Sequence, residues 1–373
     1  MNNIFGIITT GNQKPLLGEL AMKRSVSAMP VAGKYRAIDF VLSNMVNSGI
    51  DKVGVVTQYS YRSLTDHLGA GKEWDLDRRN EGLFLFPPYL SMEHKGWYKG
   101  TADGMYQNIS FLKRSHEEYV LIATGNCIYS TTYNGLLEKH IETGADITMM
   151  YYDMAGTPLE ELREFGQIKV DETGRVVDLM EKPLSPKDTV VSMGVYVLKR
   201  ELLIELLEES SSHGYYDFVR DILIRKVHEL KIYGYEFKGY WRTVNSISWY
   251  YKINMDFLNK DVREDLFGGG KKVFTKVKDE TPAKYNPEAE VKNSIIADGC
   301  IIEGYVENSI LFRGVRVGKN SRVVNSIIMQ GSVIENDVSL EHVIFDKEIT
   351  ITANHSLKGE VTAPMIVGKN RKI

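Results

Sequence analysis

Residues 5–40, FGIITTGNQKPLLGELAMKRSVSAMPVAGKYRAIDF, place an apolar run, a loop and a basic segment in immediate succession. The run, which begins at Ile4 and ends at Thr9-Thr10-Gly11, predicts a buried parallel strand that closes into a turn. A loop after such a strand often binds phosphate, through several glycines whose backbone N–H groups approach the anion. Here Gly11 is almost alone, and Pro15 removes one donor. The stretch therefore predicts a nucleotide-handling fold with a reduced phosphate loop.

The alternation of strands and helices extends to about residue 259. Short β-branched runs alternate there with amphipathic segments, which predicts a Rossmann-like α/β domain with a mostly parallel sheet and crossover helices. We expect strands at 4–9, 52–57, 119–124 and 146–152, and helices at 40–48, 62–68, 133–143 and 201–209. Ligands bind beyond the carboxyl ends of the strands in such sheets, so the candidate site lies at 9–15, 57–61 and 124–128.

The last part of the chain contains an internal repeat. Segments that start at Val317, Ile334 and Ile351 lie 17 residues apart, and within each the next aliphatic residue follows six positions later. This is the hexapeptide pattern of a parallel β-helix, whose coils must stack because one coil cannot bury its own apolar edge. Antiparallel hairpins would not explain the fixed period. We therefore predict domains at 1–260 and 290–373, joined by a polar, glycine-containing linker at 261–289.

The composition excludes several classes of protein. The chain has 373 residues, 43% of them hydrophobic, enough for two domains with their own cores. Its formal charge of −3 comes from 46 basic and 49 acidic residues that are well mixed, which argues against nucleic acid or a membrane surface as partner. The sequence has no signal-peptide pattern and no long apolar run, so we expect a cytoplasmic location. Cys127 and Cys300 are too far apart in sequence for metal-ligand spacing and fit reduced structural thiols.

Several motifs together carry a family resemblance. They are Lys23-Arg24, Gly33–Arg36, Ile38–Phe40, Trp97–Asp103, Glu181–Pro183 and Ser192–Val197. In this order they resemble the motifs of the glucose-1-phosphate adenylyltransferases (ADP-glucose pyrophosphorylases), and the resemblance covers nearly the whole chain. It implies a nucleotidyltransferase-like domain at 1–260 and a C-terminal left-handed β-helix.

Some positions depart from the family pattern. The family has aspartates at the positions of Asn126 and Thr243, a Lys-Pro at Val26-Ser27, and a glycine-rich loop with an arginine near Gly11. The resemblance implies that the two aspartates hold the Mg²⁺ of nucleotidyl transfer. Mg²⁺ requires anionic oxygen ligands, and Asn126 and Thr243 are neutral. We therefore expect no metal and no cofactor in this chain, with Mg²⁺ bound only by a catalytic partner subunit.

The resemblance also implies three groups of ligand-binding residues. The sugar-phosphate group is Glu181, Lys182, Ser192 and Gly194; the remnant of the nucleotide pocket is Gly11, Tyr98, Thr101, Asp103 and Gly125; the effector candidates are Arg24, Lys34 and Arg36. The residues by themselves allow simpler interpretations. Thr101 and Asp103 suit a helix cap, Glu-Lys-Pro alone usually marks a solvated strand end, and the basic segment suits a solvated turn.

Two functions of different classes follow. We favour a regulatory, catalytically inactive subunit of glycogen biosynthesis, similar to the non-catalytic GlgD subunits, in a tetramer-like hetero-oligomer with the catalytic adenylyltransferase. Glucose 1-phosphate or ADP-glucose is then a weak ligand, and a sugar phosphate an effector. The alternative is an active enzyme that makes ADP-glucose and diphosphate from ATP and glucose 1-phosphate. A hexapeptide acyltransferase or plain sugar-phosphate sensor has little support, because His342 and His355 lack a partner motif.

Overall fold

The computed structural model describes residues 3–11, 17–79, 81–89 and 96–373. Its contacts group the chain into two units: unit 1 joins Met1–Gln13 to Phe40–Trp241, and unit 2 joins Lys14–Asp39 to Arg242–Ile373. The grouping places the basic segment of the opening stretch with the C-terminal repeats. The predicted domain boundaries at 260 and 289 remain a prediction. No helix of the described residues is long and apolar enough to cross a membrane.

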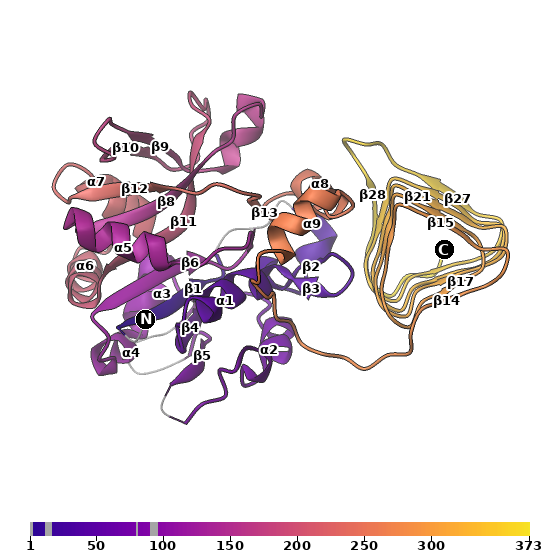
Figure 1. Cartoon of the computed structure of the whole chain (residues 1–373), viewed down its shortest axis with the longest axis horizontal. Coiled ribbons are helices and arrows are strands. Elements are labelled where there is room, and N and C mark those ends of the chain that lie inside the picture. Colours follow the sequence, from indigo (N-terminus) through magenta and orange to yellow (C-terminus); the bar gives the residue numbers. More distant parts are fainter. Residues whose placement is uncertain (1–2, 12–16, 80, 90–95) are drawn as a thin grey trace. The chain divides into compact units, whose positions relative to one another are not determined.

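Unit 1 is built on a nine-stranded sheet (Figure 1). Strands β4, β1 and β6 are parallel neighbours, β5 extends them in parallel at one edge, and β11 joins β6 antiparallel. The sheet is therefore mixed. Its strands are β1 (Ile4–Thr9), β4 (Lys52–Val56), β5 (Gly82–Phe86), β6 (Tyr119–Thr124), β8 (Ile147–Asp153), β9 (Gln167–Val170), β10 (Val176–Met180), β11 (Val190–Lys199) and β12 (Ile232–Glu236). A short strand, β7 (Cys127–Ile128), lies just beyond β6.

The helices of unit 1 follow the predicted crossovers. They are α1 (Ala37–Asn47), within which the two units divide, α2 (Arg62–Leu68), α3 (Thr101–Gln107), α4 (Ile109–Arg114), α5 (Asn134–Thr143), α6 (Arg200–Ser212) and α7 (Ile224–Lys226). Three shorter helical segments are η3 (Lys72–Trp74), η4 (Leu159–Glu164) and the π-helix η5 (Phe218–Leu223). Helix α6 packs on α3 and β11, and α5 packs on β8, β11 and β12.

The strand at the start of the opening stretch is the centre of this sheet. All six residues of β1 are buried, as the apolar run predicts. Gly6 leaves room for α1, because a Cβ at that position would lie 2.6 Å from the Sδ atom of Met45 and would force that side chain to shift. The helix therefore packs directly against the backbone of the strand. This close packing fixes the position of the turn at Thr10-Gly11, where β1 ends.

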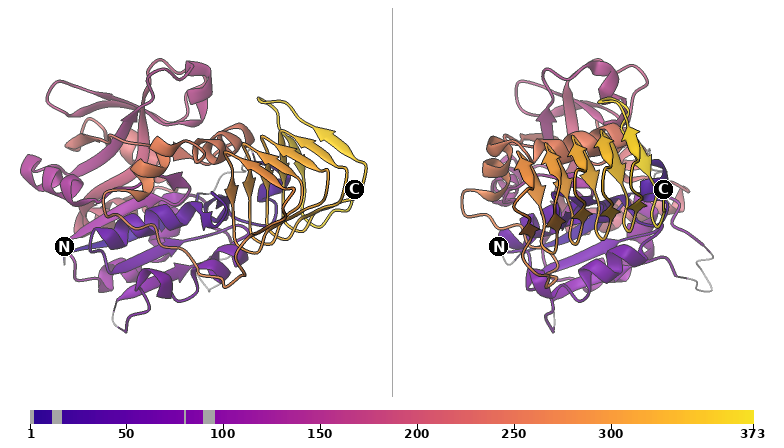
Figure 2. Two further views of the ribbon diagram at one scale, coloured as in Figure 1. Left: turned by 45° about the vertical axis from the view of Figure 1, so that its right-hand side comes forward. Right: turned by 90° about the vertical axis from the view of Figure 1, so that its right-hand side faces the viewer.

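Unit 2 contains the stacked coils of the repeat. Fifteen strands form three parallel five-stranded sheets, and the coils have a triangular outline in Figure 1 and lie in a row in Figure 2. The sheets are β14 (Lys284–Tyr285), β17 (Ile301–Ile302), β20 (Arg316–Val317), β23 (Val333–Ile334) and β26 (Thr350–Ile351); β15 (Glu290–Lys292), β18 (Tyr305–Glu307), β21 (Arg322–Val324), β24 (Ser339–Glu341) and β27 (Ser356–Lys358); β16 (Ile295–Ile296), β19 (Ile310–Leu311), β22 (Ile327–Ile328), β25 (Val343–Phe345) and β28 (Met365–Val367). The predicted β-helix is thereby confirmed; its handedness remains a prediction.

The interior of the β-helix is a column of aliphatic residues from the three sheets. Examples from each sheet are Val317 and Ile334, Val323 and Leu340, and Ile328, all at most 1% exposed. Register between neighbouring coils pairs Val317 with Ile334 and Val323 with Leu340, which is the 17-residue period of the sequence. Each coil thus buries its apolar edge on the next one.

The rest of unit 2 comes from two separate parts of the chain. Its elements are η1 (Gly18–Ala21), η2 (Val26–Ala28), β2 (Pro30–Val31), β3 (Tyr35–Arg36), β13 (Arg242–Thr243), α8 (Ile247–Asp256) and α9 (Lys260–Phe267). Within the range expected as a linker, 268–283 and 286–289 have neither helix nor strand. The Tyr251 hydroxyl of α8 donates to the carbonyl of Asn325 at 2.6 Å and lies 3.0 Å from Nδ1 of His342. His342 therefore connects α8 to the coils, and its side chain is only partly exposed.

Candidate functional site

The nucleotide side of the candidate site lies at the carboxyl ends of β1 and β4. Gly11, Tyr98 and Thr101, three of the five residues expected in the pocket remnant, line one hollow there together with Thr57 and Gln58. The hollow has a volume of about 10 Å³. This is space for one water molecule, whereas ligand pockets usually measure about 300–1,000 Å³. Residues 12–15 of the predicted phosphate loop lie outside the described residues.

The other two expected pocket residues lie beside this hollow. Gly125 follows β6, and its N–H donates to the carbonyl of Thr9 at 2.9 Å, which joins the ends of the two strands. The carboxylate of Asp103 accepts from the backbone N–H of Lys99 at 2.6 Å and from the side chain of Gln107 at 3.1 Å. The Asp103 carboxylate thus accepts a backbone hydrogen bond at the start of α3, as a capping role predicts.

The expected capping role of Thr101 at its own helix is wrong. The N-cap residue of α3 is Gly100, which has no side chain to make a cap hydrogen bond. The Thr101 hydroxyl instead accepts from the N–H of Phe218 at 2.9 Å and lies 3.4 Å from an oxygen of Asp217. Thr101 therefore joins the start of α3 to the start of η5, a contact across more than a hundred residues that local pattern does not reveal.

An exposed aromatic pair stands next to the hollow. The rings of Tyr59 and Trp97 stack with centroids 4.9 Å apart, and about half of each residue is exposed to solvent. Their chain neighbours Gln58 and Tyr98 line the hollow and are joined by a hydrogen bond of 2.8 Å from the Gln58 amide to the Tyr98 carbonyl. We did not assign either ring from the sequence, although the Trp97–Asp103 motif begins with one of them.

The sugar-phosphate candidates Glu181 and Ser192 lie on either side of one glycine. A Cβ on Gly166 would lie 2.9 Å from Oε2 of Glu181 and 3.8 Å from Cβ of Ser192. The Ser192 N–H donates to the carbonyl of Gly166 at 2.8 Å. The end of β10 and the start of β11 thus bring the two side chains together, as the resemblance implies. Tyr196 completes the group, with its hydroxyl 3.4 Å from the Ser192 hydroxyl.

Gly194 has a clear steric reason to be glycine. Its φ is +69°, and a Cβ there would lie 2.4 Å from the Oγ1 atom of Thr124 at the end of β6. The Thr124 hydroxyl donates to the Gly194 carbonyl at 3.3 Å. The irregular register of β11 between Ser192 and Tyr196 therefore lets the strand approach the end of β6.

The electrostatics of this group centre on Glu181. Burial raises the pKa of its carboxyl above the ordinary value; Asp217 adds to the increase, and the cations of Lys182 and Arg220 act against it. A carboxylate withdrawn from water accepts hydrogen bonds strongly, which suits a sugar hydroxyl. Lys182 has a φ of +50°, and its amine lies 3.8 Å from the carboxylate of Glu164. The sequence motifs did not predict that Asp217 belongs to this group.

The residues expected at the metal positions, Asn126 and Thr243, do not fit Mg²⁺. Asn126 follows Gly125 in unit 1 and presents an amide, and Thr243, which is 9% exposed in unit 2, presents a hydroxyl. Neither side chain supplies the anionic oxygen that a small divalent cation needs to replace its bound water. We therefore derive no catalytic step through a metal in this chain.

The three effector candidates lie in unit 2, and each has a different environment. Arg24 is buried and its guanidinium binds the Asp346 carboxylate at 2.5 Å. Lys34 is exposed, with its amine 5.0 Å from the centre of the Tyr35 ring. Arg36 lies on β3, and its backbone N–H donates to the Asp39 carboxylate at 2.9 Å. The interpretation of this segment as a plain solvated turn is wrong for Arg24.

Three further cations extend this group, and the sequence did not point to them. Burial lowers the pKa of Lys347 to about 7, and repulsion from Arg36, Arg24 and Lys278 adds to the effect. Burial lowers the pKa of Lys278 as well, and Arg313 contributes to that shift. We call Arg24, Arg36, Lys278, Arg313 and Lys347 the basic cluster. Like charges gather in this way where an anion is to be bound.

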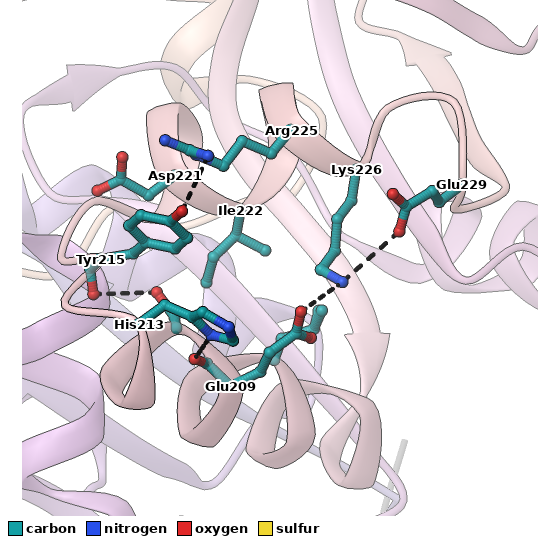
Figure 3. A pocket seen from close by; sticks show the side chains of 10 residues that line it. Glu209, His213, Tyr215, Asp221, Ile222, Arg225, Lys226 and Glu229 are labelled. Atoms are coloured by element: carbon teal, nitrogen blue, oxygen red, sulfur yellow. Dashed lines mark hydrogen bonds and ion pairs between the residues drawn. The ribbon is translucent and has the colours of Figure 1, made fainter.

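A separate hollow of about 240 Å³ lies in unit 1 between α6 and the η5–α7 segment (Figure 3). Its charged walls satisfy one another: Lys226 binds Glu209 at 2.9 Å and Glu229 at 3.6 Å. The Arg225 guanidinium lies over the Tyr215 ring at 4.1 Å. Lys226 is thus already paired, and we assign no ligand to this hollow.

Comparison with known proteins adds the following findings. Residues 7–260 match the family model described as nucleotidyl transferase, and residues 280–360 match the GlmU-like, C-terminal hexapeptide model. A glucose-1-phosphate adenylyltransferase of Thermotoga neapolitana is 39% identical over 327 residues, 87% of this chain and 77% of the relative. That of Clostridium kluyveri is 41% identical over 330 residues, 87% and 85% of the two chains. That of Acetivibrio thermocellus is 38% identical over 355 residues, 94% and 82%.

Proposed function

Because this chain belongs to the glucose-1-phosphate adenylyltransferase family, we propose that it is the regulatory, non-catalytic member of a pair. In this role it resembles the GlgD subunits of glycogen biosynthesis and assembles with a catalytic subunit that forms ADP-glucose. The observation that carries the proposal is the pair of neutral side chains, Asn126 and Thr243, where nucleotidyl transfer needs metal-binding carboxylates.

The size of the expected loss follows from what the metal does in such a reaction. It neutralises the charge of the phosphates and aligns the attacking oxygen, and removal of both carboxylate ligands takes away several kcal/mol of this stabilisation. Each 1.36 kcal/mol is a factor of ten in rate, so turnover falls by roughly 10² to 10⁴.

The features that remain intact favour a retained binding role. Glu181, Ser192 and Tyr196 still form a group beside Lys182, which supplies a point charge for a phosphate. In this proposal glucose 1-phosphate or ADP-glucose binds weakly there. The basic cluster of unit 2 is the corresponding candidate for a sugar-phosphate or phosphate effector, whose binding alters the turnover of the partner subunit.

An assay of pyrophosphate release with Mg²⁺, ATP and glucose 1-phosphate tests the catalytic half of the proposal. The chain alone is expected to give almost no product, and turnover in the ordinary range of about 1–10³ s⁻¹ would identify it as an active enzyme instead. The matched variant Asn126→Asp/Thr243→Asp restores both carboxylates and shows how much of the loss they explain.

Co-expression with a catalytic relative tests the regulatory half. We expect the two chains to elute together in size-exclusion chromatography and the complex to differ from the catalytic chain in turnover or in its response to sugar phosphates. Separate elution, or a complex with the kinetics of the catalytic chain alone, would rule out this role.

A further inference from the structure

The turn that leads into η5 has its backbone N–H groups bound by side chains. The five N–H groups of residues 216–220 each donate to a side-chain oxygen at 2.9–3.0 Å. Four of them donate to the carboxylates of Asp217 and Asp221, which belong to the segment itself. The N–H of Phe218 instead donates to the hydroxyl of Thr101, more than a hundred residues away. The two carboxylates therefore hold the shape of the turn, and Thr101 ties the turn to the start of α3.

The Thr101 hydroxyl uses both of its hydrogen-bonding capacities in this contact. It accepts from the N–H of Phe218 at 2.9 Å and donates at 3.4 Å to the carboxylate that caps η5. Two backbone features beside it show how closely the segments approach. The N–H of Asp103 donates to the carbonyl of Tyr216 at 3.0 Å, and a Cβ on Gly100 would collide with that carbonyl oxygen. The start of α3 thus fixes the position of the turn.

Phe218 connects the turn to the sugar-phosphate group. Its ring and that of Tyr196 are both buried, and they meet edge to face with centroids 5.4 Å apart. The Tyr196 hydroxyl lies 3.4 Å from the Ser192 hydroxyl, which also accepts from the N–H of Gly194 at 3.2 Å. Burial raises the pKa of Tyr196, so its hydroxyl keeps a proton that it can donate to Ser192. A shift of the Phe218 ring would therefore displace Tyr196 and, with it, the Ser192 hydroxyl.

We propose that Thr101 is a positioning residue for the sugar-phosphate group. Its hydroxyl fixes the backbone of Phe218, the Phe218 ring fixes Tyr196, and Tyr196 holds the Ser192 hydroxyl in place for the ligand. The inference rests on the proposed binding of glucose 1-phosphate to this group. Phe218 is also the first residue of a π-helix, a rare form that is frequent at functional sites. Because Thr101 lines the hollow at the end of β1 as well, the two parts of the candidate site share this residue.

A matched control separates positioning from a purely structural role. Ser48 is a buried residue of the same unit, and its hydroxyl accepts from the N–H of Tyr133 at 2.8 Å and donates to the carbonyl of Asn44. Ser48→Ala therefore removes a hydroxyl that, like that of Thr101, joins two distant segments. If Thr101 served stability alone, Thr101→Val and Ser48→Ala would both lower the melting temperature and leave the sugar-phosphate group unchanged.

The first measurement needs no ligand. The full chain, labelled with 3-fluorotyrosine, gives a fluorine NMR signal for Tyr196 that is assigned by its loss in Tyr196→Phe. We expect this signal to move in Thr101→Val, which keeps the shape of threonine but can neither donate nor accept. It should stay at the wild-type position in Thr101→Ser, which restores the hydroxyl, and in Ser48→Ala. Thr101→Ala removes the same hydroxyl and replaces the valine variant if that chain is poorly folded.

The second measurement is calorimetry with glucose 1-phosphate. Loss of the positioning hydrogen bond should weaken binding by a factor of about three to ten, whereas Thr101→Ser and Ser48→Ala should stay within about twofold of wild type. An unmoved Tyr196 signal in Thr101→Val, or wild-type affinity in that variant, overturns the inference. Absence of heat with the wild-type chain would instead defeat the proposed sugar-phosphate binding, and the Tyr196 signal would still decide whether Thr101 positions the group.

Discussion

Replacement of Arg24 by methionine should destabilise unit 2 more than any exposed charge change in it. The two side chains of the Arg24–Asp346 pair are 6% and 4% exposed, and their atoms lie 2.5 Å apart. Methionine keeps much of the volume of arginine but leaves the Asp346 carboxylate buried without its partner. The loss is therefore mainly the cost of an uncompensated buried charge, not of lost packing.

The magnitude can be estimated from comparable pairs. Breaking a buried ion pair from one side costs about 3–5 kcal/mol. The backbone N–H of Lys347 still donates to Asp346 at 2.7 Å, and the pKa of the Lys347 amine should rise once Arg24 no longer repels it. Both effects soften the loss, so we expect about 3 kcal/mol, the lower end of that range. In a unit of this size the melting temperature then falls by about 6–12 °C.

The assay is thermal and urea unfolding followed by near-ultraviolet circular dichroism, for Arg24→Met, Asp346→Leu and the double variant. The double variant leaves no buried charge of the pair, so its loss should be smaller than the sum of the two single losses by a few kcal/mol. The control is Glu19→Gln, which breaks the exposed pair of Glu19 with Arg371 and should cost less than about 1 kcal/mol.

The reasoning would be refuted by a loss for Arg24→Met no larger than that for Glu19→Gln. It would also be refuted if the losses of the two single variants simply added in the double variant, because the side chains would then not be coupled.

Three further outcomes are expected. Lys182→Ala should abolish the calorimetric heat of weak glucose 1-phosphate binding; if wild type shows no heat at millimolar ligand, the pocket binds nothing. Gly194→Ala should lower the melting temperature strongly, because the new Cβ would lie 2.4 Å from the Oγ1 atom of Thr124. The control Gly144→Ala also has a positive φ, but open space surrounds it, so this variant should lose only about 1 kcal/mol of stability. Equal losses for the two variants would contradict the steric argument. Burial lowers the pKa of His140 from 6.5 to about 4. The free energy of unfolding should therefore be highest above pH 6.5 and fall by at most about 3 kcal/mol as the pH drops toward 4. A His140→Gln variant with the same pH dependence would contradict this.

Local pattern was enough for the repeating parts of the molecule. The run Ile4–Thr9 predicted the buried strand β1, and the spacing of Val317, Ile334 and Ile351 predicted the stacked coils, with the register that the structure has. In each case the buried positions follow one another regularly along a single stretch of chain. The pattern of apolar residues in that stretch is therefore enough to predict its secondary structure.

The sequence motifs also named Glu181 and Ser192 together, and the structure places both beside Gly166; their binding of a sugar phosphate stays a prediction. The family comparison agrees with the resemblance that these motifs carry. The assignment of Asn126 and Thr243 as neutral replacements required only the alignment of motifs, since it concerns the identity of side chains and not their positions.

Only the tertiary structure determined which distant residues share an environment. Arg24 meets Asp346 across 322 positions, and Thr101 caps Phe218 instead of its own helix. The pairing of Arg24 depends on how residues 17–39 pack on the coils within unit 2. The same packing places Arg36 and Arg24 where their charges, together with burial, lower the pKa of the Lys347 amine. Contacts of this kind produce no repeating pattern in the sequence, because each occurs only once. They join segments that are brought together by the packing of the whole intervening chain.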